Sequence, residues 1–377
     1  MNKLKVLVIF GTRPEAIKMA PLVKALEEAP NIQTKVCVTG QHKEMLVQVL
    51  KIFNIVPDFN LDVMLKNQTL AGLTAKIITE LQQVLCDFKP DLALVHGDTT
   101  TALASALACY YQKIDVGHIE AGLRTNNIYS PFPEEGNRQL ISKIAKLHFS
   151  PTEETRNNLL AEGVKNDDIA VTGNTVIDAL SLCLNKLKVN INRMDEIKNN
   201  FSDFFNKKYI LITGHRRENF GDGFINICDA INDLSKKYPD ICFVYPVHLN
   251  PAVREVVYKK LSGDNIFLIE PLDYEPFCYL MAHCFIIMTD SGGIQEEAPY
   301  LGKPVILMRE NTERPEAIQA GTVKLVGNKR ENIVNAVSSI LDNNEEYVVM
   351  QKSHNPYGDG NASKYIIDFI VNKYNLV

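Results

Sequence analysis

The sequence predicts an α/β protein in which two domains, each built on a parallel sheet, face each other across a cleft. Its 377 residues exceed the length at which a single hydrophobic core usually stops growing. Short apolar runs rich in β-branched residues alternate with segments of helical periodicity, and this alternation is typical of parallel sheets. The alternation weakens once in the middle of the chain and then restarts, which indicates a second sheet.

The first domain is predicted from runs of strand length and from helical segments between them. The strands are expected at Lys5–Phe10, Lys35–Val38, Leu92–His96, Val116–Ile119 and Leu147–Ser150. Apolar residues at three- and four-residue spacing predict helices at Pro14–Glu28, His42–Phe53, Leu70–Phe88 and Thr99–Tyr111. The pattern weakens after Asp178 and becomes polar over Asn190–Lys208.

The second domain is predicted from the strand run Tyr209–Thr213 onward. Further strands are expected at Ile241–Pro246, Ile266–Ile269, Cys284–Thr289 and Pro304–Met308. We therefore expect two Rossmann-like domains, residues 1–173 and 174–357, with a boundary near Gly173. A last helix, Ala362–Tyr374 within about 358–377, is expected to pack back on the first domain.

The composition excludes several classes of partner. Lys and Arg number 40 against 45 Asp and Glu, a formal charge of -5, so no basic field attracts nucleic acid or an anionic membrane. The eight cysteines lack C-x-x-C spacing, which predicts reduced core residues. The apolar opening, Val6–Phe10, is too short for a signal peptide, and no run approaches the roughly 20 apolar residues of a membrane span. A cytoplasmic location follows by elimination.

The ends of the predicted strands carry small or polar clusters, such as Gly11-Thr12-Arg13, His96-Gly97-Asp98 and Gly214-His215-Arg216. Ligands of open α/β sheets bind outside the carboxyl ends of the strands. We therefore expect the functional site where two such sheet edges face each other.

A glycine turn in the second domain suits a phosphate group. Ser291, Gly292 and Gly293 follow a predicted buried strand and open a helix, where backbone N–H groups and the helix dipole favour a pyrophosphate. A plain tight turn is the alternative. Glu296 and Glu297 then offer an acceptor for ribose hydroxyls, or else lie on a solvated helix face.

Basic residues follow strands in both domains. Arg13 precedes Pro14 at the first turn of a predicted helix and could bind a phosphate, helped by Lys18 one turn later. The alternative is a surface ion pair with Glu15. Arg314 follows the strand after the glycine turn and could close on a nucleotide, or else form an ion pair within its loop.

Three carboxylates are candidates for proton transfer. Asp98 and Glu120 follow strand ends, and Glu134 follows the proline-rich loop Ser130–Pro133. Carboxylates that converge on one site shift each other's pKa values apart and so provide an acid and a base. Asp98 could instead cap the following helix. Glu120 lies between Ile119 and Ala121, where an ionisable residue indicates a function.

His215 is the strongest histidine candidate. It follows a strand of the second domain and precedes Arg216 and Arg217, and these neighbours favour anion binding over a structural role. His248 is a weaker candidate of the same kind, whereas His96 and His118 are predicted to be buried and structural. No grouping has the spacing of a metal site, so no metal is expected.

Together these segments resemble the bacterial non-hydrolysing UDP-N-acetylglucosamine 2-epimerases over essentially the whole chain. The motifs that carry the resemblance occur in order: GTRPEAIKMAPLV, HGDTTT, GHIEAGLRT, SPFPEE, TGNTVIDAL, TGHRREN, YPVHLNP, TDSGGIQEEAP, GKPV, TERPEA and NPYGDG.

The resemblance implies a fold like that of the GT-B glycosyltransferases, with UDP-N-acetylglucosamine and UDP as ligands, and a homodimer. It places Phe277 near the uracil ring. The family's active-site positions match these residues: Arg13, Lys18, Asp98, Glu120, Glu134, His215, Phe277, Ser291, Gly292, Gly293, Glu297 and Arg314.

The family's chemistry needs no cofactor, and no G-x-G-x-x-G dinucleotide signature follows the first strand. Loss of UDP across C1–C2 gives 2-acetamidoglucal, and UDP then adds back with protonation on the other face to give UDP-N-acetylmannosamine for cell-surface polysaccharides. Asp98, Glu120 and Glu134 share the roles of base and acid, which the sequence does not assign individually. A hydrolysing 2-epimerase and a GT-B glycosyltransferase are the alternatives.

Some relatives bind a second, activating substrate molecule, and the matching residues are Gln41, Glu134, Arg217 and His248. Glu44 and Asn67 stand where glutamine and arginine are expected. These two departures remove hydrogen-bond donors and add an anion, so they argue against activation by substrate in this protein.

Overall fold

The computed structural model describes residues 3–41, 43–65 and 68–376, with only the backbone of residues 43–45. It divides into two compact units, an N-terminal unit of Met1–Leu182 with Tyr357–Val377, and a C-terminal unit of Cys183–Pro356. Helix α7, Thr175–Val189, continues from the first unit into the second. The boundary expected near Gly173 lies just before α7, whereas the division of the structure falls inside it.

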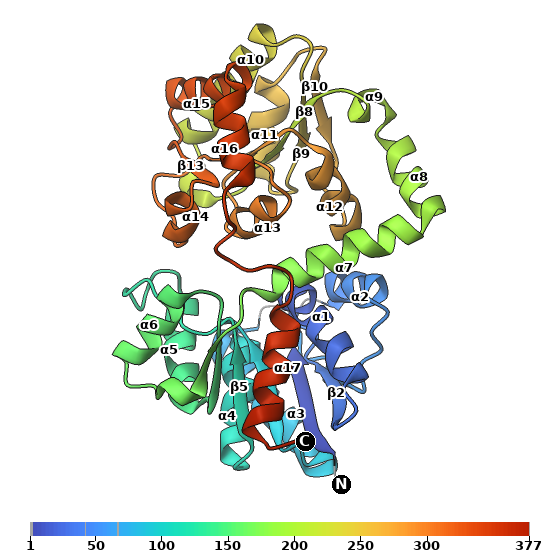
Figure 1. The fold of residues 1–377 in the computed structure, drawn as a ribbon, viewed down its shortest axis with the longest axis vertical. Coiled ribbons are helices and arrows are strands. Elements are labelled where there is room, and N and C mark those ends of the chain that lie inside the picture. Colours follow the sequence, from blue (N-terminus) through green and yellow to red (C-terminus); the bar gives the residue numbers. More distant parts are fainter. Residues whose placement is uncertain (1–2, 42, 66–67, 377) are drawn as a thin grey trace. The chain divides into compact units, whose positions relative to one another are not determined.

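The N-terminal unit is an α/β layer structure around a parallel sheet with the strand order β3-β2-β1-β4-β5-β6-β7 (Figure 1). Its strands are β1 Leu4–Phe10, β2 Ile32–Val38, β3 Phe59–Asn60, β4 Leu92–His96, β5 Asp115–Ile119, β6 Leu147–Ser150 and β7 Ile169–Val171. Its helices are α1 Arg13–Glu28, α2 Lys43–Ile52, α3 Leu70–Phe88, α4 Thr100–Tyr111, α5 Glu134–Ile144, α6 Glu153–Ala161 and α17 Ala362–Lys373, with the 3₁₀ turn η1 Asn166–Asp168.

The C-terminal unit repeats this plan with the strand order β10-β9-β8-β11-β12-β13, again all parallel. Its strands are β8 Tyr209–Thr213, β9 Cys242–Pro246, β10 Ile266–Ile269, β11 Ile286–Thr289, β12 Val305–Leu307 and β13 Val323–Leu325. Its helices are α8 Ile191–Asn200, α9 Ser202–Phe205, α10 Asp222–Lys237, α11 Pro251–Lys260, α12 Tyr274–His283, α13 Ile294–Tyr300, α14 Pro315–Gln319, α15 Arg330–Asp342 and α16 Asn344–Lys352, with the 3₁₀ turn η2 Arg217–Asn219. The predicted α/β class with two parallel sheets is confirmed.

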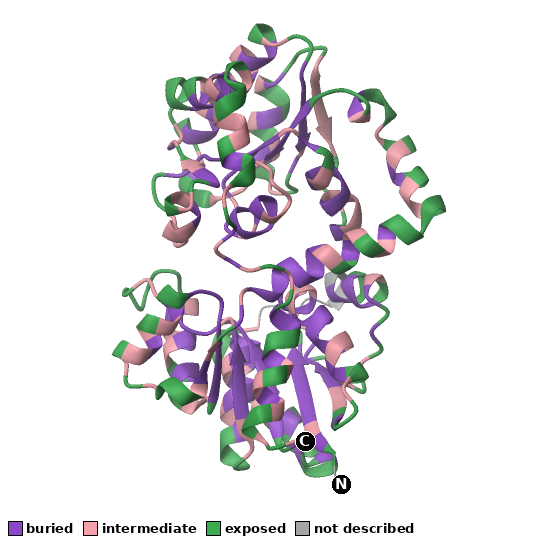
Figure 2. Cartoon of the chain, viewed as in Figure 1, coloured by how far each residue is buried: buried purple, intermediate pink, exposed green. Residues whose placement is uncertain are grey.

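Each sheet lies between helices and is buried on both faces (Figure 2). Parallel strands covered on both faces are apolar along their whole length. Strand β4 shows this pattern, since all five of its residues are buried. The core of the N-terminal unit gathers β1, β4, α3 and α4 side chains, and that of the C-terminal unit gathers β8, β9, β11 and α10 side chains.

Three histidines of the N-terminal sheet are buried: His96, His118 and His148. His118 on β5 is paired in register with His148 on β6, and its Nε2 donates to the carbonyl oxygen of Gly97 at 2.7 Å. Burial lowers the pKa of His118 to about 3 and the pKa of His96 and His148 to about 4. All three are therefore neutral in the folded protein at pH values where the unfolded chain takes up protons.

This difference predicts acid sensitivity. Well above pH 6.5, the ordinary histidine pKa, these side chains are neutral in both the folded and the unfolded chain and cost no stability. As the pH falls from 6.5 toward 4, the unfolded chain binds protons that the folded chain excludes, so the free energy of unfolding decreases. Each histidine contributes about 1.4 kcal/mol per pH unit in that window. His118→Gln is expected to reduce the slope of the unfolding free energy against pH by about that amount, measured by urea denaturation between pH 5.5 and 4.5. The same change at exposed His354 should leave the slope unaltered, and equal slopes for the two variants would contradict the prediction.

Candidate active site

The candidate residues of the N-terminal unit lie where three neighbouring strands end. Strands β1, β4 and β5 are adjacent and parallel, and their carboxyl ends lead to Gly11, to Gly97 and Asp98, and to Glu120. Strand β1 lies between β2 and β4, and the order of the strands reverses at β1: β2 and β3 follow on one side of it and β4 to β7 on the other. Such a switch point is where ligands bind in doubly wound sheets.

In the turn after β1, the carboxylate of Glu15 contacts groups other than Arg13. Glu15 is buried and accepts from the backbone N–H of Gly11 at 3.0 Å, from that of Thr12 at 2.7 Å and from Thr99 Oγ1 at 2.6 Å. Burial raises the pKa of Glu15, and these hydrogen bonds oppose the rise. Glu15 therefore caps α1, and no contact with Arg13 is formed within the described residues. The alternative of an Arg13–Glu15 pair is therefore excluded.

Glycine is required at the start of this turn. A Cβ atom on Gly11 would lie 2.0 Å from Thr39 Oγ1 and 2.6 Å from Thr101 Oγ1. Real Cβ atoms do not approach so closely, so the ends of β1 and β2 and the start of α4 can pack together only around a glycine.

Glu120, which lies between two apolar residues, has an unusual backbone conformation. Its φ is 62°, in the left-handed region that non-glycine residues rarely adopt. Its carboxylate forms an ion pair with Lys18 of α1, and Oε2 accepts from Asn174 Nδ2 at 2.8 Å. His96 Nε2 lies 3.7 Å from the same oxygen, but its lowered pKa leaves it neutral near pH 7. Lys18 is thus a charged partner of Glu120.

Asp98 does not cap the helix that follows it. Thr99 is the cap of α4, since its Oγ1 accepts from the backbone N–H of Ala102 at 3.0 Å. The Asp98 carboxylate instead contacts Arg138 of α5, with Oδ2 2.5 Å from Nη2. Glu134 is the first residue of that same helix. The structure therefore brings Asp98 next to the helix that carries Glu134, and the capping alternative is wrong.

In the C-terminal unit, His215 follows β8 and is organised by buried Asp290 at the end of β11. Asp290 Oδ2 accepts from the backbone N–H groups of His215 at 3.0 Å and Arg216 at 2.9 Å. The His215 ring stacks on His248, with centroids 5.1 Å apart and an interplanar angle of 19°. Burial lowers the pKa of His215, Asp290 opposes this, and His248 and Arg216 lower it further. His215 is therefore neutral near pH 7.

Two arginines lie over the glycine turn. A Cβ atom on Gly292 would be 2.7 Å from Arg314 Nη1 and 3.4 Å from Arg216 Nη2, so a side chain at this position would displace the Arg314 guanidinium. Arg314 also forms an ion pair with Glu296, which is buried. The Nε of Arg216 is buried and has no hydrogen-bond partner in the described chain. Ser291 and Gly293 complete the turn, and Gly293 is the N-cap of α13. Two guanidinium groups beside the start of a helix are an arrangement that can bind an anion.

The remaining candidates of this unit lie on α12 and α13. Glu297 is buried, as is Glu296, so the alternative of a solvated helix face is excluded. The hydroxyl of buried Tyr274 donates to Glu297 Oε1 at 3.3 Å. Phe277 is half-buried on α12.

The residues of the expected second substrate site are divided between the two units. Gln41 of the N-terminal unit accepts from Thr101 Oγ1 at 2.9 Å through its Oε1. Arg217 and His248 of the C-terminal unit are exposed. The side chain of Glu44 and the whole of Asn67 lie outside the described residues.

Three partners of the candidates were not predicted from the sequence: Asn174, Arg138 and Asp290. They contact Glu120, Asp98 and His215, respectively. Asn174 and Asp290 follow short apolar stretches as the other candidates do, so their position was a usable signal. Arg138 lies inside a helix, where an arginine ordinarily indicates a solvated face.

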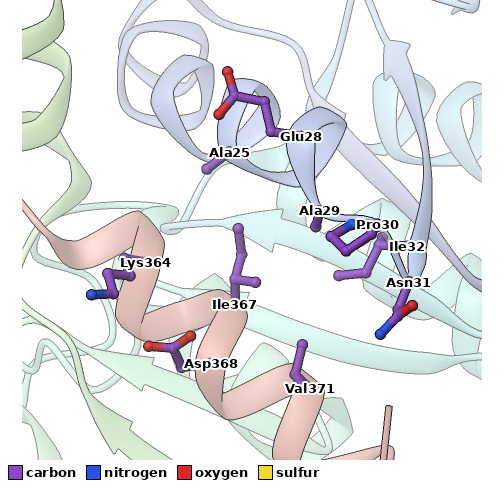
Figure 3. Close-up of a pocket in the computed structure, with 10 residues that line it drawn as sticks. All are labelled: Ala25, Glu28, Ala29, Pro30, Asn31, Ile32, Lys364, Ile367, Asp368 and Val371. Carbon is purple, nitrogen blue, oxygen red and sulfur yellow. The ribbon is translucent and has the colours of Figure 1, made fainter. Parts of the chain in front are cut away.

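A separate hollow in the N-terminal unit contains none of the candidates (Figure 3). It lies between α17 on one side and the end of α1 and start of β2 on the other, with Ile367 and Val371 among its lining residues. This is the amino edge of the sheet, opposite the strand ends where ligands bind. Among the described residues, no three His, Cys, Asp or Glu side chains gather closely enough to hold a metal ion. No described helix has the length and apolar character needed to traverse a bilayer.

Two parallel-sheet units of this kind define a two-sheet α/β protein with a GT-B-like fold. Residues 24–371 match the family model described as UDP-N-acetylglucosamine 2-epimerase. The chain is 54% identical over 371 residues to the UDP-N-acetylglucosamine 2-epimerase of Escherichia coli K12, covering 98% of this chain and 99% of that one.

Comparison with solved structures identifies the same family. The chain is similar to the Neisseria meningitidis UDP-GlcNAc 2-epimerase bound to UDP-GlcNAc, with a TM-score of 0.90 and 54% identity, over 98% of this chain and 100% of that one. It is also similar to the Methanocaldococcus jannaschii enzyme in complex with UDP-GlcNAc and UDP, with a TM-score of 0.82 and 35% identity, over the same shares. The chain belongs to the UDP-N-acetylglucosamine 2-epimerase family.

Proposed function

We propose that this protein interconverts UDP-N-acetylglucosamine and UDP-N-acetylmannosamine by reversible loss and return of UDP, without hydrolysis. The observation that carries the proposal is the pair Asp98 and Glu120, which follow neighbouring strands and are each held by a cationic side chain. Full-length relatives that carry the epimerase name, two of them solved with UDP-GlcNAc bound, support the choice of substrate.

The chemistry explains why two carboxylates are needed. The C2–H bond has no adjacent carbonyl, so its removal is coupled to departure of the nucleotide from C1. One carboxylate takes the C2 proton, the C–H electron pair forms the C1=C2 bond, and the C1–O pair leaves with UDP. In the return step the UDP oxygen adds to C1, and a carboxylic acid protonates C2 from the opposite face. Nothing is oxidised or reduced overall, so the residues need no cofactor.

The other charged groups act on the departing nucleotide. UDP gains negative charge as the C1–O bond breaks, and donors aimed at that charge lower the barrier. Arg13 and the Gly292 turn, with Arg314 and Arg216 over it, are suited to its phosphate groups. His215 is neutral before UDP binds and retains one N–H to donate. Glu297 and Phe277 are proposed to hold the ribose and the uracil.

Proton NMR in deuterated water tests the proposal. UDP-N-acetylglucosamine is expected to give UDP-N-acetylmannosamine with deuterium at C2. An ¹⁸O label placed in the oxygen that bridges C1 and the β-phosphorus should also move to the non-bridging positions of the β-phosphate, because the C1–O bond breaks and forms again. Product without deuterium at C2 would contradict the mechanism. Accumulation of N-acetylmannosamine and free UDP would instead identify a hydrolysing enzyme, and turnover only with an added acceptor a glycosyltransferase. Asp98→Asn, which cannot exchange a proton with C2, is expected to lower the rate by about 1000-fold to a small but measurable residual rate.

A further inference from the structure

Arg138 is a buried arginine on α5 that the proposed reaction does not use. It is 8% exposed, and its guanidinium bridges two carboxylates. Nη2 lies 2.5 Å from Asp98 Oδ2, and Nη1 donates to Glu135 Oε2 at 3.2 Å. An arginine is rarely buried without a structural or functional reason, because its charge must be paired.

Glu135 fixes the arginine in place. It is fully buried, and its Oε2 also accepts from the backbone N–H of Thr125 at 3.0 Å, while Oε1 accepts from Gln139 Nε2 at 2.8 Å. With these contacts the Glu135 carboxylate has little freedom to move, and the guanidinium that it holds is likewise confined. The neighbouring carboxylates Glu134 and Glu135 thus have different environments, since only Glu135 is enclosed.

The same helix holds the backbone of Asp98. Asn137 Nδ2 donates to the Asp98 carbonyl oxygen at 2.8 Å. Helix α5 therefore contacts Asp98 twice, through Asn137 at the backbone and through Arg138 at the carboxylate. Asp98 Oδ2 is taken by Arg138, whereas Oδ1 forms no hydrogen bond within the described residues. The Asp98 side chain is 26% exposed, so the carboxylate is not fully enclosed.

We propose that Arg138 is the positioning residue for Asp98, holding Oδ2 so that Oδ1 is presented to the C2 proton of the substrate. This inference rests on the proposed epimerase function. Arginine suits the task because it stays charged in proteins and cannot accept the transferred proton. The proton therefore remains on Asp98, from which it exchanges with solvent, while the other carboxylic acid protonates the opposite face of C2. Its planar guanidinium also engages two carboxylates in a fixed geometry.

A double-mutant cycle tests the inference, using Arg138→Gln, Asp98→Asn, the double variant and the unchanged enzyme. Arg138→Gln is expected to lower kcat about 100-fold, the upper range for partners that orient reacting groups, with KM and UDP affinity changed less than about threefold. Because Arg138 acts through Asp98, adding Arg138→Gln to Asp98→Asn should lower kcat no further. A further loss of the same factor in the Asp98→Asn background would overturn the inference, as would a raised KM with unchanged kcat.

Arg124→Gln is the matched control. Arg124 is another arginine of the N-terminal unit, with a side chain only 3% exposed, and it donates to Glu162 at 2.6 Å and to Ser142 at 2.8 Å, neither of which is a candidate. Its loss should leave kcat within about twofold, so a fall equal to that of Arg138→Gln would show a merely structural effect and overturn the inference. If Arg138→Gln does not fold, Arg138→Lys, which keeps a charge beside Glu135, replaces it in the same cycle.

The two proposals fail in different ways. If the unchanged enzyme forms no UDP-N-acetylmannosamine, the proposed function fails and this inference fails with it. If the unchanged enzyme turns over and the two substitutions lower kcat independently, only the role of Arg138 is overturned.

Discussion

Replacing Glu120 by glutamine is expected to lower kcat for C2 interconversion of UDP-N-acetylglucosamine by about 1000-fold, the middle to upper range for loss of a general acid or base. Glutamine keeps the size of the side chain and one acceptor oxygen for Asn174, but it cannot exchange a proton with C2. Lys18 would lose its charged partner at the same time. The affinity for UDP should change little, because the glycine turn Ser291–Gly293, which is proposed to hold the phosphate groups, belongs to the C-terminal unit.

The measurement is the initial rate of deuterium incorporation at C2, together with a UDP titration. Asp115→Asn is the matched control, because Asp115 begins the same strand, β5, whose far end leads to Glu120. It pairs with Lys146 at 2.5 Å at the opposite edge of the sheet, so its loss should not change the rate. Full activity of the Glu120→Gln variant would remove this carboxylate from the mechanism.

Replacing Gly292 by alanine is expected to weaken UDP binding by about 30-fold. The new Cβ would lie 2.7 Å from Arg314 Nη1 and 3.1 Å from its Cζ. The guanidinium cannot simply swing away, because Glu296 and Glu313 hold it. A displaced arginine would lose a charge-assisted hydrogen bond to phosphate, worth about 2 kcal/mol, or roughly 30-fold in affinity.

Isothermal titration with UDP measures this loss. Gly263→Ala is the control in the same unit, since its Cβ would meet only Ile266 and Asn265, at 3.4 Å or more. Unchanged UDP affinity in the Gly292→Ala variant would show that the two arginines do not hold the nucleotide.

The strands that form the two cores could be predicted closely from the sequence. Leu92–His96 and Tyr209–Thr213 begin and end as predicted, because a central parallel strand is apolar throughout and a polar cluster follows it. Short outer strands were missed, such as Ile169–Val171 and Val323–Leu325, each of which has only one buried residue. Helix Ile191–Asn200 was missed for the same reason, since only Ile197 is buried and no apolar stripe is visible.

The site was predictable where a polar residue directly follows a buried strand, as Glu120 and His215 do. It was less predictable where the decision depended on a partner far along the chain. Whether Asp98 caps a helix depends on Thr99 taking that place and on Arg138, forty residues later, holding the carboxylate. A contact between residues so far apart in the chain cannot be predicted from their spacing in the sequence.

The left-handed backbone of Glu120 lowers the stability of the fold at a position where the proposed reaction requires a carboxylate. The strand beside it is followed by Gly97 with the same φ of 62°, so the two turns share a conformation for which glycine is the natural occupant. A side chain there costs about 1 kcal/mol of strain. In a Lys18→Met background, which removes the charge that Glu120 pairs with, variants of position 120 selected for thermal stability alone should favour glycine, whereas variants of the unchanged protein selected for turnover should keep glutamate. Divergence between these two populations would mark the position as one where selection retains a strained residue for its chemistry.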